Sequence, residues 1–256
     1  MHYDKNYLTK VILKLDFGPI PSLLDPTGES GFTNLIKEKY PVLNPKPTTT
    51  INVNVGPGGP VVQQQISGMI WEHKPKSDSS KSVFLSNTFL STEYGKNEYD
   101  HFPAFFEEIE YLFSKFQSIY HLSSINRIGL RYINEVNFEE GDPLDWSGFI
   151  AEDKIKGVLS GFNKDSMNLL RSMHMLHLKK ENMILSLNYG IFNSEYPNPV
   201  ARRNFLIDLD GSISNQIPSD QVLESVHQLN ALCEEAFEDC IGDGLREKMG
   251  VIDGDH

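Results

Sequence analysis

The chain has 256 residues, of which 39% are hydrophobic and 23% charged, a composition typical of a folded globular protein. No run approaches the roughly 18 apolar residues that span a bilayer, and the start, MHYDKNYLTK, lacks the apolar segment of a signal peptide. We therefore expect a cytoplasmic protein with no membrane partner. The net charge of −12 argues against direct nucleic-acid binding, which requires Lys and Arg to neutralise phosphates, and suits a basic protein partner.

The first half of the sequence predicts a strand, a short helix, a meander and a long helix. Residues 8–17 alternate apolar and polar side chains, the period of a strand with one buried face. A short helix should end near Tyr40, because a proline follows. Three antiparallel strands are expected at 48–55, 61–74 and 82–94, the first two joined by a turn at GPGGP. Residues 102–120 place aromatic side chains at helical spacing, which predicts an amphipathic helix with a core face.

The second half predicts a strand at 125–138, one or two short helices before residue 168, and three strands at 170–180, 182–192 and 204–214. A long helix should run from Ser219, as N-cap, to about Met249. We expect an α+β fold: a curved, mainly antiparallel sheet with long amphipathic helices packed on one side. The chain fits a single domain, 1–256. It leaves open whether halves at 1–140 and 141–256 are related, because no internal repeat is apparent.

Neither the cysteines nor the histidines form a metal-binding pattern. Cys233 and Cys240 are seven apart in a predicted helix, about two turns, which is too far for a disulfide, so we expect both to be core residues. His174 and His177 are three apart on a predicted strand and therefore face opposite sides. The sequence predicts no metal site and no cofactor.

Two aspartates in the last predicted strand raise the question of catalysis. NFLIDLDGSIS resembles the nucleophile loop of haloacid-dehalogenase-type phosphatases, in which Asp208 would be the nucleophile. Such a loop follows the first strand of a parallel sheet, whereas only one predicted helix follows this motif. A calcium loop also fails, because its twelfth position would be Ser219 rather than Glu. We expect Asp208 and Asp210 to share a sheet face in a charge network.

Two arginines form the candidate ligand site. Arg127 and Arg131 are four apart on a predicted strand and flank Gly129 on the same face. Guanidinium groups suit phosphate and carboxylate, and the glycine would leave room for an anionic nucleotide or phosphate compound. The alternative is that both arginines pair with Asp208 and Asp210 on a neighbouring strand.

Several segments together resemble a sporadically distributed family of prokaryotic proteins of unknown function and similar length. These segments are VILKLDF, SVFLSNTFLSTEY, RIGLRYINEV, FLIDLDG and CIGDGLREKMG, which extend over nearly the whole chain. The resemblance implies no assigned catalytic residues, and the patchy occurrence of such proteins implies a mobile-element or antiphage-defence setting.

Three functional hypotheses follow. The leading one is a non-enzymatic protein-binding subunit or regulator in a bacterial antiphage-defence or toxin–antitoxin-like system, with another protein as partner. The second is a ligand-binding module in which the curved sheet and the long helix enclose a cavity and Arg127 and Arg131 hold an anionic nucleotide or phosphate compound. The third is a cryptic Asp-dependent phosphohydrolase. Association with a second copy of the chain stays open under all three.

Overall fold

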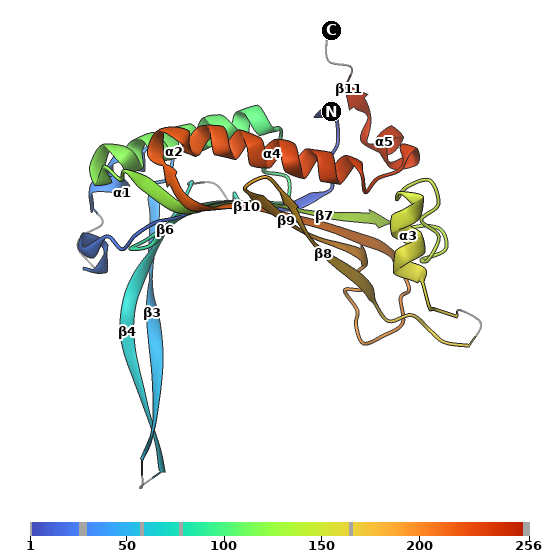
Figure 1. Cartoon of the computed structure of the whole chain (residues 1–256), viewed down its shortest axis with the longest axis horizontal. Coiled ribbons are helices and arrows are strands. Elements are labelled where there is room, and N and C mark those ends of the chain that lie inside the picture. The colour runs from blue at the N-terminus through green and yellow to red at the C-terminus, as the bar shows by residue number, and fades with distance from the viewer. Residues whose placement is uncertain (1, 26–29, 57–58, 77–78, 164–165, 253–256) are drawn as a thin grey trace.

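A computed structural model describes residues 2–25, 30–56, 59–76, 79–163 and 166–252. Within these ranges, nine antiparallel strands form one curved sheet, with helices over one of its faces (Figure 1). The α+β class and the antiparallel sheet are thus confirmed. The strands lie in the order β3 (Val42–Gly56), β4 (Gly59–Lys74), β5 (Lys81–Ser86), β6 (Phe89–Gly95), β2 (Leu8–Asp16), β7 (Ser124–Phe138), β10 (Arg203–Pro218), β9 (Met183–Ile191) and β8 (Ser172–Lys180). A separate two-stranded sheet joins β1 (His2–Tyr3) to β11 (Val251–Ile252) near the chain ends.

Helices α1 (Ser30–Ile36), α2 (Phe102–Tyr120) and α4 (Val222–Glu238) lie over the same face of the sheet (Figure 1). Helices α2 and α4 touch, since the rings of Phe106 and His227 are 4.0 Å apart. The spacing of apolar residues in α2 buries Phe105 and Phe116 among others, and each such side chain contributes about 2 kcal/mol. No helix in the described part of the chain has both the length and the apolar character needed to cross a bilayer.

The strands bury alternate side chains against these helices. In β2, Val11, Leu13 and Leu15 are buried in the core. The intervening side chains of β2 point to the opposite face, which carries no helix at its centre (Figure 1). We call this surface the open face. It is where the polar residues singled out by the sequence lie.

The predicted strand at 82–94 is wrong in one respect, because it is two strands, β5 and β6. They are joined by a tight turn in which the Ser86 hydroxyl oxygen accepts hydrogen bonds from the amides of Thr88 (3.1 Å) and Phe89 (3.2 Å). A serine-based turn carries no glycine or proline signal in the sequence. The meander therefore contains four strands rather than three.

The first strand of the meander begins earlier than predicted, at Val42, and passes through Pro45 and Pro47. Proline interrupts a central strand but is tolerated at an edge, where its missing amide donor is not needed, and β3 is an edge strand. Together β3 and β4 project from the body as a long ribbon (Figure 1). The predicted GPGGP turn includes residues 57 and 58, which lie outside the described ranges.

The predicted C-terminal helix is also interrupted. It begins with a 3-10 turn at Ser219–Gln221, and the Ser219 hydroxyl donates to the Leu122 carbonyl instead of capping the helix. Helix α4 ends at Glu238, and α5 (Asp243–Met249) follows. The break is fixed by Gly242, whose amide donates to the Phe149 carbonyl at 2.9 Å. A Cβ atom at Gly242 would lie 2.4 Å from the Gly148 carbonyl oxygen, so only glycine fits there.

Candidate functional site

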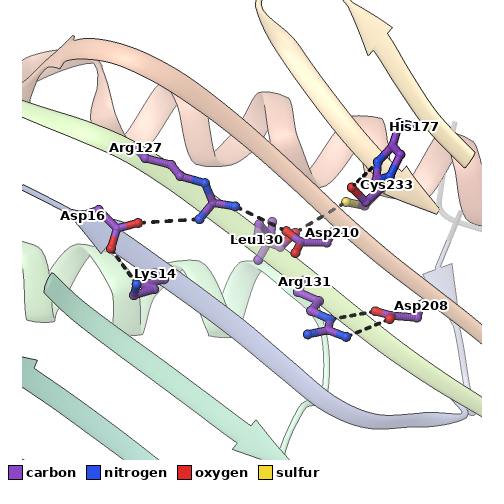
Figure 2. A network of polar contacts seen from close by, with 10 residues as sticks. Lys14, Asp16, Arg127, Leu130, Arg131, His177, Asp208, Asp210 and Cys233 are labelled. Carbon is purple, nitrogen blue, oxygen red and sulfur yellow. Dashed lines mark hydrogen bonds and ion pairs between the residues drawn. The ribbon is translucent and has the colours of Figure 1, made fainter. Parts of the chain in front are cut away.

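The four predicted site residues meet on the open face. Strand β7 lies between β2 and β10, which places Arg131 opposite Asp210 and Arg127 opposite Asp16. Arg131 donates from Nε and Nη2 to the two carboxylate oxygens of Asp208, both at 2.8 Å (Figure 2). Asn188 of β9 donates to the same carboxylate at 3.3 Å. The Asp208 side chain is only 8% exposed, so the carboxylate of this ion pair is largely withdrawn from water.

Arg127 makes looser contacts. Its guanidinium lies 3.6 Å from the Asp16 carboxylate and 3.7 Å from the Asp210 carboxylate (Figure 2). A Cβ atom on Gly129 would lie only 2.7 Å from Nη1 of Arg127. The space that the glycine was expected to leave for an anion is therefore occupied by the Arg127 side chain itself.

The charges of this network cancel. Lys14, which lies 2.6 Å from Asp16, joins the two arginines, and these three cations face three carboxylates: Asp16, Asp208 and Asp210. Hydrogen bonding to Asp208 raises the pKa of Arg131 above its ordinary value. Burial raises the pKa of Asp210, although Arg127 and Arg131 oppose the shift. Because no positive charge is left over, binding of an anion at Arg127 and Arg131 stays a prediction that requires an ion pair to open.

The surroundings of Asp208 give little support to phosphatase chemistry. Asp208 lies in the middle of β10, which is paired on one side with β7 and on the other with β9. Both pairings are antiparallel, so the carboxyl ends of these strands do not gather at one edge. Among the residues that the structure describes, no three His, Cys, Asp or Glu side chains are arranged to hold a metal.

The open face ends at an edge strand that the sequence reasoning did not single out. Helix α3 (Glu152–Leu159) covers the start of β8, where the Ser172 hydroxyl donates to the Val158 carbonyl at 2.6 Å. From Met175 to Lys180 every side chain of β8 is exposed. In the described part of the chain, no strand pairs with the outer side of β8.

Apolar side chains flank this edge on both faces of the sheet. The strand register places Met175 on the open face and Leu176 and Leu178 on the helix-covered face. His174 contacts Tyr189, and His177 is hydrogen-bonded to Ser186 at 2.9 Å, so the two histidines point to opposite faces as predicted. In SMHMLHLKK, apolar residues fall on both faces of the strand, and this is the sequence pattern that could have drawn attention to β8. An internal strand has the same pattern, so the sequence does not identify β8 as an edge.

The two edges of the sheet differ. Pro45 and Pro47 remove amide donors from β3, and Lys46 lies between them, all features that discourage further strand pairing. Strand β8 contains no proline and ends in two lysines. The start of β3 is thus protected by proline, whereas β3 from Thr48 onward and the whole of β8 contain none.

A scan against models of known protein families finds no match for this chain, and a search of curated proteins finds none either. The family resemblance of the sequence segments therefore stays a prediction. Function has to be argued from the geometry of the open face and of the β8 edge.

Proposed function

We propose that this chain is a non-enzymatic protein-binding subunit whose partner adds an extended segment to the outer edge of β8. The observation that carries the proposal is the open β8 edge, with exposed apolar side chains on both faces. In strand addition, backbone hydrogen bonds supply affinity, and contacts with alternate side chains supply specificity. The proposal extends to a bacterial antiphage-defence or toxin–antitoxin-like system, for which the support is the family resemblance.

A groove beside the edge can take a side chain of the added strand. It has a volume of about 170 Å³ and lies between β8 and α4, lined by Leu178, Leu185, Leu232 and Ala236 among others. Lys180 and Glu235 form an ion pair at 2.5 Å across it. An apolar side chain buried there contributes about 2 kcal/mol.

The charge of β8 favours a different protein over a second copy. Two copies of β8 could pair antiparallel with Leu176 at the centre of the pairing. Lys179 and Lys180 of each copy would then lie near the start of β8 in the other copy, which follows Arg171. Like charges across paired strands are unfavourable. The net charge of the whole chain suggested a basic partner. The lysines at the end of β8 instead favour a partner segment that carries acidic residues where it lies beside Lys179.

We further infer that the sheet consists of two related halves. Strands β2 and β7 lie side by side in the sheet. Outward from β2 lie β6, β5 and β4, and outward from β7 lie β10, β9 and β8. Along the chain, α2 follows β6 and α4 follows β10. In this proposal the division lies between Tyr120 and Ser124, where α2 ends and β7 begins, rather than at the boundary near residue 140 considered from the sequence. Strand β4 corresponds to β8, but β4 is covered by β3, for which the second half has no equivalent. The partner's segment would take that vacant position.

The experiment is affinity capture of the protein from its own host's lysate, followed by native mass spectrometry. Leu176→Lys tests the edge, and Leu43→Lys on the protected edge is the matched control, since the two leucines are 37% and 38% exposed. We expect a stoichiometric second polypeptide with the wild type and with the control but not with Leu176→Lys. Hydrogen–deuterium exchange of the complex should show protection of β8.

Capture that is insensitive to Leu176→Lys, or protection confined to other strands, would refute strand addition at β8. A homodimer in place of a second polypeptide would assign the edge to self-association. Thermal melts of both variants establish that any loss of capture is not a loss of folding.

A further inference from the structure

A separate cavity of about 130 Å³ lies on the helix-covered face, beneath the two ends of the chain. Its floor is the centre of the sheet, with Tyr132 and Asn134 of β7, and its walls come from the start of α2 and the second half of α4. Tyr3 and Met249, from the two ends of the chain, line its mouth. A cavity of about 150 Å³ holds a benzene molecule, so this one suits a ligand of roughly six non-hydrogen atoms.

Two buried amides are directed into this cavity. Asn230 is 7% exposed and accepts a hydrogen bond from the Tyr132 hydroxyl at 2.7 Å, which leaves its Nδ2 without an acceptor in the described part of the chain. Asn134 is 5% exposed and donates to the Ile207 carbonyl at 3.4 Å, and its Oδ1 has no donor among the described residues. Both residues line the cavity, so these amides are positioned to meet a ligand or water there.

Aromatic and acidic side chains make up much of the remaining lining, together with Leu8, Leu209, Met249 and His101. Tyr99, Phe102, Tyr132 and Phe237 supply ring surfaces. Asp100, which lies 3.5 Å from Nε2 of His101, and Glu234 are at the exposed rim. A third acid, Glu238, is already neutralised by Arg246 at 3.0 Å. Among the residues that the structure describes, no lysine or arginine lines the cavity. Burial raises the pKa of Tyr99 to about 12, so its hydroxyl stays neutral near pH 7.

We propose that this cavity binds a small organic cation, a protonated alkylamine whose apolar chain lies against the aromatic rings. Ring faces attract cations, and Glu234 and Asp100 add charge complementarity at the rim. Asn134 Oδ1 is available to accept from the ammonium N–H groups. An anion of the same size is excluded by the two carboxylates. This site is separate from the β8 groove, with which it shares no lining residue.

The test uses n-pentylammonium, n-pentanol and pentanoate as probes of similar size and different charge, in titrations followed by NMR on the full chain. We expect n-pentylammonium to bind with a Kd of about 1 mM or tighter, n-pentanol at least about 5-fold more weakly, and pentanoate not at all. Glu234→Gln should weaken the cation about 5-fold. Glu235→Gln is the matched control, because its carboxylate pairs with Lys180 on the side of α4 away from the cavity.

Absence of n-pentylammonium binding would overturn the proposal. Equal binding of n-pentylammonium and n-pentanol would also overturn it, since the cavity would then select only for apolar character. An equal effect of Glu234→Gln and Glu235→Gln would show that the cation senses the general acidic surface. Because both glutamates are exposed, neither substitution is expected to unfold the protein.

Discussion

Asp208 and Asp210 are two residues apart on one face of one strand, yet the structure gives them different roles in stability. Asp208 accepts two hydrogen bonds from Arg131 at 2.8 Å, and its side chain is 8% exposed. Asp210 lies 3.7 Å from Arg127, beyond hydrogen-bonding distance, and is 37% exposed. The substitutions Asp208→Asn and Asp210→Asn keep the side-chain shape, remove the charge and replace one acceptor oxygen with an amide donor, so they compare the two carboxylates directly.

We expect Asp208→Asn to lower the free energy of unfolding by about 2 kcal/mol. A hydrogen bond to a charged group contributes about 1.5–3 kcal/mol, and breaking a buried ion pair costs about 3–5 kcal/mol. The Arg131 side chain is 40% exposed, so water can solvate it once its partner is lost, which places the cost at the lower end. Asp210→Asn should change the free energy of unfolding by less than about 0.5 kcal/mol, as expected for an exposed ion pair.

The pH dependence separates the two further. Burial raises the folded-state pKa of Asp210 above its ordinary value of 3.8. The stability associated with this group is therefore fully present below pH 3.8 and is lost as pH rises through the raised folded-state pKa. Across that window, the stability of the wild type relative to Asp210→Asn should fall as pH increases.

Urea denaturation followed by the fluorescence of Trp71 and Trp146, which are both buried, measures these differences. Equal costs for the two substitutions would refute the distinction between a tight and a loose pair. Double-mutant cycles that combine Arg131→Met with each aspartate substitution should give a coupling energy of about 1–2 kcal/mol between Arg131 and Asp208, and a smaller one between Arg131 and Asp210. Coupling of similar size for both would mean that the network acts as one unit.

Three further predictions concern the edges and the core. Pro45→Thr combined with Pro47→Thr restores amide donors to β3, so size-exclusion chromatography with light scattering should show more self-association, with little change in monomer stability. Burial raises the pKa of the Cys233 and Cys240 thiols to about 12, so neither should react with Ellman's reagent at pH 8 until urea exposes both. Gly190→Ala should cost more than about 2 kcal/mol and detach β8, because its Cβ would lie 2.1 Å from the Ser172 carbonyl oxygen. Gly18→Ala, with no atom within 4 Å, is the control, and equal urea midpoints for the two glycine variants would contradict this account.

The helices and strands that are determined by the local spacing of apolar residues could be predicted from the sequence. The alternation in β2 and the helical spacing in α2 follow from backbone geometry, and both segments were predicted within a residue or two. The break before α5 was not, because Cys240, Ile241 and Leu245 continue a helical spacing. What interrupts it is the approach of Gly242 to Gly148, a contact between segments distant in sequence.

The candidate sites likewise have some features that the sequence predicts and others that depend on how distant segments meet. That Arg127 and Arg131 share a face followed from their spacing, but their pairing with aspartates depended on β7 lying beside both β2 and β10. A cavity between the sheet and a long helix was expected, but its lining could not be predicted, because its walls come from both chain ends, from α2 and from α4. Arg127 and Arg131, which were expected in it, lie on the opposite face of the sheet. The β8 edge depended on strand order, which the sequence pattern does not specify.

The contrast between the two sheet edges limits the size of any assembly built by strand pairing. A sheet with two receptive edges can grow indefinitely, as fibrils do, because each added strand presents a new edge. Here Pro45 and Pro47 hinder pairing along the first part of the β3 edge, which leaves β8 as the edge that is free of proline over its whole length. If the incoming segment is itself a single strand with a blocked outer side, the complex ends at one copy of each protein. The prolines of β3 would then determine stoichiometry, although they lie at the opposite edge of the sheet from the bound partner.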